Sequence, residues 1–130
     1  MRTILAFIAL TLLVSTAGAM SPPSFMVFFS RGSTAITEQG DRTIEAVASV
    51  FRQRVNVRVV ITAHTDGAEA QVSSSDLSPA RGEAVKRRLI EFGVSPDRIE
   101  TWAFADSQGL VKHPPGVAEP QNRRVELIIQ

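Results

Sequence analysis

Hydrophobic residues along the chain form four short runs, separated by longer stretches in which apolar and polar positions are mixed. The runs at residues 25–29, 57–63, 98–105 and 124–129 contain many β-branched or aromatic residues, which favours strands. The run at 57–63 alternates little, which is typical of a central strand covered on both faces. The pattern therefore predicts four strands, of which the second lies inside a sheet.

Two of the stretches between these runs carry apolar residues three and four positions apart, as one face of a helix requires. The first is preceded by Thr37, a capping residue, whereas Gly40 weakens the first turn and favours a later start. The predicted apolar face of this helix contains Ile44, Val47, Ala48, Phe51 and Val55.

The second helical stretch begins with Ser78 and Pro79, a capping hydroxyl followed by a proline suited to the first helical position. Gly93 predicts the helix end in a left-handed conformation, with Val94 packing back on the last turn. The predicted inner face contains Ala80, Ala84, Val85, Leu89 and Phe92, with Arg81 at its edge.

Two polar segments are predicted to be loops, residues 65–76 and the Gly- and Pro-rich residues 106–121. The resulting order is strand, helix, strand, helix, strand, loop, strand. It predicts an α/β (α+β) sandwich in which two main helices pack on a sheet. An antiparallel last strand would make the sheet mixed, and Trp102 is expected in the core.

Residues 1–19 have the three parts of a secretory signal peptide: a basic start, an apolar run and an Ala-x-Ala end at Ala19. The competing interpretation is a retained membrane anchor. The apolar run is shorter than the roughly 20 residues that a spanning helix needs, which favours cleavage. Residues 20–24 are then a linker, and residues 25–130 form the domain.

Charge and cysteine content exclude several classes of function. Cleavage removes Arg2 and leaves 13 basic against 13 acidic residues, a balance that disfavours a nucleic-acid partner. The chain has no cysteine, which excludes disulfides and thiolate metal sites. A length of 130 residues predicts a single domain, and an exported chain without disulfides favours a bacterial envelope.

Asp66 and Arg81 are the candidate functional pair. Asp66 follows the central strand, where open α/β sheets usually place ligands. Arg81 stands in the first turn of a helix, and its guanidinium can hold a carboxylate through two hydrogen bonds. Together they suit a zwitterion, with its ammonium on Asp66 and its carboxylate on Arg81. The alternative is an intramolecular Asp66–Arg81 salt bridge that holds the loop in place.

Two other kinds of site have less support. A metal site made of His64 and His113 with Asp66 and Asp106 matches no known ligand spacing. His64 is interpreted as a strand-end histidine bonded to the backbone. The serines at 73–75 could be combined with His64 and Asp66 as a hydrolase triad, but no Gly-x-Ser-x-Gly motif is present. We therefore predict no catalytic residue, no metal and no cofactor.

An ordered set of short motifs resembles the OmpA C-terminal-like domain, the family that includes the peptidoglycan-associated lipoprotein and flagellar stator proteins. The resemblance covers residues 26–130. Its motifs are His64-Thr65-Asp66, Leu77-Ser78-Pro79-Ala80-Arg81, Gly93-Val94, Arg98-Ile99 and Asn122-Arg123-Arg124-Val125-Glu126.

The resemblance implies an OmpA-like βαβαβ-β fold and non-covalent binding of peptidoglycan through the diaminopimelate residue of its stem peptide. In the family, an Asp and an Arg grip that residue, and Asp66 and Arg81 occupy their positions. The candidate ligand-binding residues are Asp66, Arg81, Thr65, Leu77, Ser74, Asn122 and Arg123.

Three positions depart from the family pattern: Glu69 replaces a usual Gly, Ser74 a usual Asn, and Ser30 a usual acid. The predicted function is to anchor the protein, or an envelope protein partner, to the cell wall from the periplasm or outer membrane, with no enzymatic activity and no stable membrane span after cleavage. Because the 67–75 loop is altered, the alternative is an interaction module of an envelope complex with weak or no peptidoglycan binding.

Overall fold

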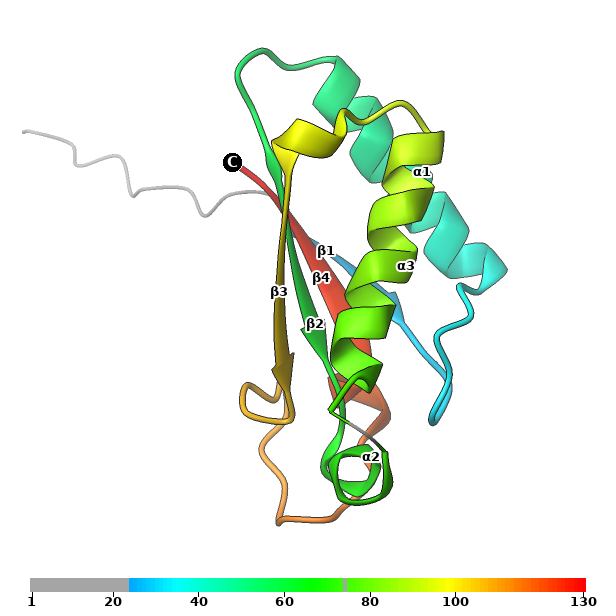
Figure 1. Cartoon of the computed structure of the whole chain (residues 1–130), viewed down its shortest axis with the longest axis vertical. Helices are drawn as coiled ribbons and strands as arrows, with labels where there is room; N and C mark the ends of the chain where they lie inside the picture. The colour runs from blue at the N-terminus through cyan, green and yellow to red at the C-terminus, as the bar shows by residue number, and fades with distance from the viewer. Residues whose placement is uncertain (1–23, 74) are drawn as a thin grey trace, which may run out of the picture.

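The computed structural model describes residues 24–73 and 75–130, so the predicted signal peptide 1–19 lies outside the described residues. Four strands form one mixed sheet in the order β1-β4-β2-β3 (Figure 1). Strand β2 is parallel to β3, and β4 is antiparallel to both β1 and β2. The strands are β1 (Ser24–Phe28), β2 (Val59–His64), β3 (Ile99–Ala105) and β4 (Arg124–Ile129).

Helices α1 (Glu38–Arg52) and α3 (Leu77–Glu91) lie side by side on one face of this sheet (Figure 1). The predicted sandwich of two main helices on a mixed sheet is therefore confirmed. The core lies between the two layers, because alternate residues of each strand point toward the helices. It contains Val27, Ile44, Val47, Val59, Ile61, Val85, Leu89, Val125, Leu127 and Ile129.

The predicted Thr37 cap of α1 is confirmed, but the helix does not start late at Gly40 and ends earlier than predicted. The Thr37 side chain caps it by accepting a hydrogen bond from the Gly40 N–H, and Gly40 lies within the first turn. A Cβ at Gly40 would lie 2.9 Å from Val27 Cγ1, so glycine allows α1 to approach β1 closely. After Arg52 the chain leaves the helix and turns at Asn56, which has a positive φ of 57°. Val55 is consequently exposed rather than part of the buried face.

Helix α3 starts at Leu77, and the predicted cap at Ser78 is wrong. The Ser78 hydroxyl accepts a hydrogen bond from the Ala105 N–H, which ties the start of α3 to the end of β3. Pro79 is tolerated as the third residue of the helix, because the first N–H groups of a helix have no intrahelical acceptor.

The rest of α3 follows the prediction except at one position of its inner face. Ala80 is exposed, and Gly82 is buried in its place, where a Cβ would lie 2.9 Å from Thr101 Cγ2. The C-terminal prediction is confirmed: Gly93 has a φ of 99°, and the Val94 N–H donates to the Leu89 carbonyl.

The segment predicted as a loop at 65–76 contains a short helix, α2 (Gly67–Val72). Asp66 caps it by accepting a hydrogen bond from the Glu69 N–H, while the Glu69 side chain accepts one from the Asp66 N–H. This reciprocal capping box stabilises a helix start in a segment with few apolar residues. Residues 106–121 are irregular, as predicted, and end in a 3-10 turn at Pro120–Asn122.

No described helix covers the other face of the sheet (Figure 1). Trp102 was predicted in the core but is 53% exposed on this open face, because side chains alternate along β3 and its neighbour Thr101 is the one that points toward Gly82 of α3. Within residues 24–73 and 75–130, none of the helices is long and apolar enough to cross a membrane.

Candidate functional site

The candidate site lies at one end of the molecule, where β2 ends, α2 follows and α3 begins (Figure 1). Asp66 is the residue between β2 and α2, and Arg81 is in the second turn of α3. Both side chains are fully buried. The structure therefore places the two predicted residues in one region but not on the surface.

Arg81 uses all five of its N–H donors. Nε donates to the Ser33 carbonyl, and the two Nη atoms each donate to one backbone carbonyl, of His64 and of Ser30. The remaining two donors go to Glu69: Nη1 to Oε1 at 2.9 Å and Nη2 to Oε2 at 2.5 Å. A guanidinium has five N–H groups, so no donor is left for a ligand in this arrangement.

Glu69 occupies the side of the Arg81 guanidinium that carries its two Nη atoms. Its two oxygens face the two Nη atoms in the bidentate geometry typical of arginine–carboxylate recognition. Each oxygen also accepts one backbone N–H, Oε1 from Asp66 and Oε2 from Gly32. The residue at the usual Gly position is thus a buried carboxylate that pairs with Arg81.

Asp66 does not pair with Arg81, so the salt bridge considered from the sequence is not present. Its Oδ1 accepts the capping hydrogen bond from Glu69, and its Oδ2 accepts hydrogen bonds from the Glu119 N–H and Arg123 Nη1. Asp66 therefore joins α2 to the end of the 106–121 loop. Its carboxylate has partners on both oxygens.

Both carboxyl groups are stabilised in their charged form. Burial acts to raise the pKa of Glu69, but the Arg81 guanidinium and the two backbone N–H groups outweigh burial and hold the pKa below its ordinary value. Burial likewise opposes ionisation of Asp66, and the N–H groups of Glu69 and Glu119 with the Arg123 side chain lower its pKa overall. Both groups are therefore anionic at neutral pH.

A cavity of about 200 Å³ lies directly beside Glu69. Glu69 and Thr65 form part of its wall, and the Thr65 hydroxyl is buried without a hydrogen-bond partner. Buried hydroxyls normally have a partner, but this one is closed to water, so a ligand group could reach it only after part of the cavity wall moves. The lining residues are Thr65, Glu69, Ala70, Ser73, Ser75, Ser78, Ala105 and Asp106.

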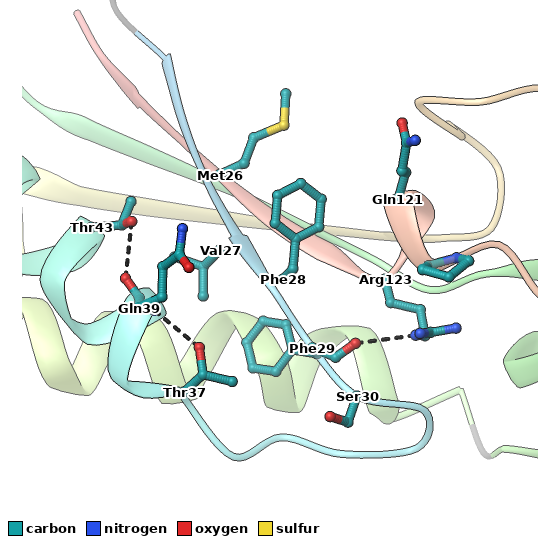
Figure 2. Close-up of a pocket in the computed structure, with 12 residues that line it drawn as sticks. Met26, Val27, Phe28, Phe29, Ser30, Thr37, Gln39, Thr43, Gln121 and Arg123 are labelled. Atoms are coloured by element: carbon teal, nitrogen blue, oxygen red, sulfur yellow. Dashed lines mark hydrogen bonds between the residues drawn. The ribbon is translucent and has the colours of Figure 1, made fainter.

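A larger groove of about 520 Å³ runs along β1, which has a free edge (Figure 2). Figure 2 shows Met26 and Phe28 on one side of β1 and the N-terminal turn of α1, with Thr37, on the other. Arg123 lines this groove and also bonds Asp66, so its side chain connects the groove with the buried site.

The other predicted ligand-binding residues fall into different surroundings. Arg123 contacts Asp66, whereas the Asn122 side chain is turned away and makes two hydrogen bonds to the Val111 backbone. Leu77 is the first residue of α3 and is partly buried. Ser74 lies outside the described residues. In the sequence Glu69 stands out only as a departure from the family pattern, although an acid three residues after Asp66 has the spacing of a capping box.

The alternative chemistries find no assembled site in the described residues. The His64 Nε2 atom contacts the Thr62 hydroxyl rather than the backbone, and the ring stacks on Phe104 with centroids 5.6 Å apart. Neither interaction involves a serine, so a hydrolase triad is not formed there. Across residues 24–73 and 75–130, no three His, Cys, Asp or Glu side chains gather as metal ligands would.

Comparison with curated proteins finds relatives in the bacterial envelope. An outer membrane protein of Gluconacetobacter diazotrophicus is 28% identical over 112 residues, which are 82% of this chain and 30% of that protein. A peptidoglycan-associated lipoprotein of Pseudomonas putida is 28% identical over 77% of this chain and 60% of its own length. The chain therefore spans less than two thirds of the length of either relative.

Solved structures share the fold. The peptidoglycan-associated lipoprotein of Burkholderia pseudomallei superposes with a TM-score of 0.69 at 23% identity, covering 81% of this chain and 89% of that one. The periplasmic domain of Helicobacter pylori MotB gives a TM-score of 0.65 at 21% identity, covering 79% and 69%. The family model described as the OmpA family matches residues 28–123, from the end of β1 to the start of β4, and this chain therefore belongs to the OmpA family.

Proposed function

We propose that the domain binds peptidoglycan non-covalently through the diaminopimelate residue of a stem peptide and has no enzymatic activity. One observation carries the proposal: Arg81 already holds a carboxylate, that of Glu69, in bidentate geometry beside a cavity of about 200 Å³. Membership of the OmpA family supports it, since the family is known for association with peptidoglycan.

The cavity fits one end of a diaminopimelate residue in size and chemistry. Its volume of about 200 Å³ is of the order of one amino-acid side chain, and its wall carries several hydroxyl groups. In the proposed complex the ligand carboxylate binds Arg81, and the carboxylates of Asp66 and Glu69 provide negative charge for the ligand ammonium. The role is to anchor the protein, or a partner, to the cell wall in the periplasm or at the outer membrane.

Purified cell-wall sacculi test this proposal. Because Asp66 and Arg81 also support the fold, the variants are Thr65→Val, which removes only the unpartnered hydroxyl, and Ala70→Phe, which blocks the cavity from the exposed face of α2. Ala46→Phe on the exposed side of α1 is the matched control. We expect both cavity variants, but not the control, to reduce retention on diaminopimelate-type sacculi. Equal retention on lysine-type sacculi, or by all variants, contradicts the proposal.

A second candidate is an interaction module of an envelope complex with weak or no peptidoglycan binding. It is favoured by the occupied Arg81 and by the groove along β1. The strand contains no charged residue and no proline, the usual features that prevent an edge strand from pairing with another chain. An extended segment of a partner could add there as a further strand. Two results together would favour this candidate. The wild type would not be retained on sacculi, and the Phe28→Glu variant would lose an envelope protein that cross-links to the wild type.

A further inference from the structure

Glu69 and the ligand compete for the same guanidinium. We propose that Glu69 is a specificity-determining residue of the site, a built-in competitor that a ligand carboxylate must displace from Arg81 before it binds. This inference rests on the proposed function for the identity of the ligand. The competition itself follows from the geometry, because all five Arg81 donors are used and Glu69 takes the two that face it.

The contacts of Glu69 show what displacement requires. Its carboxylate would give up four hydrogen bonds, two from Arg81 and one each from the N–H groups of Gly32 and Asp66. The Glu69 backbone can stay in place, because its own N–H is capped by Asp66 and need not move with the side chain. The neighbouring cavity, which Glu69 lines, offers space for the displaced side chain and a route for the ligand.

Displacement selects for ligands with a free carboxylate. An incoming carboxylate can restore the two bidentate hydrogen bonds to Arg81, whereas an amide restores at most one acceptor and brings no charge to a buried cation. We therefore expect the domain to bind stem peptides whose diaminopimelate carboxylate is free and to bind those in which it is amidated much more weakly. Pairing of Glu69 with Arg81 also lowers the apparent affinity for every ligand. The intrinsic affinity is multiplied by the fraction of molecules in which Glu69 has left Arg81.

The first test uses acetate as a minimal carboxylate and does not depend on peptidoglycan. The variant Glu69→Ala leaves Arg81 with two unused donors, and Glu83→Ala removes an exposed glutamate of α3 as the matched control. We expect acetate to raise the melting temperature of Glu69→Ala in a saturable way, beyond the effect of chloride at the same ionic strength. The wild type and Glu83→Ala should show no such acetate effect. Absence of acetate-specific stabilisation in Glu69→Ala overturns the inference.

The second test measures retention on diaminopimelate-type sacculi. We expect Glu69→Ala to bind at least tenfold more tightly than the wild type, because a buried two-point ion pair keeps the displaced form of Glu69 below about one molecule in ten. Glu69→Gln keeps the side-chain volume and removes the charge. Its affinity for sacculi should lie between those of the wild type and Glu69→Ala, and it should fold without added acetate. Equal binding by the wild type, Glu69→Ala and Glu69→Gln would show that Glu69 does not compete with the ligand. Acetate stabilisation of Glu69→Ala without any retention on sacculi would support the competition for Arg81 but refute the proposed ligand.

Discussion

Arg81 and Glu69 form a two-point ion pair inside the domain, with both side chains almost completely shielded from solvent. The same guanidinium contacts the backbone of Ser30, Ser33 and His64, and it lies 5.1 Å above the ring of Phe29. Arg81 therefore joins α3 to the end of β2, to α2 and to the segment after β1. The residue expected to hold a ligand is also a structural centre of the fold.

Removing either partner of this pair should destabilise the domain strongly. Glu69→Ala leaves a buried guanidinium without its counter-charge, a loss that typically costs about 3–5 kcal/mol of unfolding free energy. Arg81→Ala should cost slightly more than Glu69→Ala. Besides the ion pair it removes three hydrogen bonds to backbone carbonyls, whereas Glu69→Ala removes two from backbone N–H groups. Urea unfolding followed by circular dichroism measures both values.

Arg42→Ala is the control for these measurements. Arg42 forms an exposed ion pair with Glu38 one helical turn away, and such pairs contribute little to stability. We expect its unfolding curve to overlap that of the wild type within error. An Arg81→Ala curve that also overlaps the wild type would contradict the buried pair described for this domain.

Asp66 should hold the end of the 106–121 loop against α2. Asp66→Ala removes the cap of α2, a loss of about 0.5–2 kcal/mol, together with the acceptor for the Glu119 N–H and for Arg123. Hydrogen exchange followed by NMR should show faster exchange at the Glu69 and Glu119 amides. Thr37→Ala, which removes the cap of α1, should leave both amides unchanged. Slow exchange at Glu119 in Asp66→Ala would show that the loop is held by other contacts.

Most of the fold could be predicted from the sequence because the hydrophobic periodicity reports burial directly. The strand at β4 and the end of α3 at Gly93 are examples in which one local signal is sufficient. The errors occur where a tertiary contact decides between local options. The Ser78 hydroxyl could cap a helix but bonds the end of β3, and Trp102 belongs to a face that no described helix covers.

The residues of the site were predicted in part. The pairing of Arg81 with Glu69 was not, because it depends on which acid can reach the guanidinium in the folded chain. Motif order identified Asp66, Thr65, Arg81 and Arg123, which the structure brings into one region. The partner of Arg81 could not be deduced, since Asp66 and Glu69 are both acids at suitable spacing. The formation of α2 decides it, because the helix turns Glu69 inward and engages Asp66 as its cap.

His64 should make the domain less stable in mild acid. Burial and the nearby positive charge of Arg124 lower the pKa of His64 to about 4 from its ordinary 6.5, against the opposing effect of Glu126. The unfolded chain therefore binds a proton between pH 6.5 and 4 that the folded domain does not bind. The unfolding free energy should fall as the pH falls through this window, and Glu69 and Asp66 should add to the loss below it. An NMR titration of the His64 ring with a midpoint near 6.5 would contradict this.

The pKa of the Glu69 carboxyl, measured by carbon-13 NMR with and without a soluble diaminopimelate-containing stem peptide, tests the central claim most directly. In the free domain Arg81 holds this pKa below its ordinary value. If the ligand carboxylate takes over the guanidinium, the Glu69 pKa should rise toward or above the ordinary value at saturating peptide. A Glu69 pKa that stays low and unchanged at every peptide concentration would show that Arg81 never leaves its internal partner.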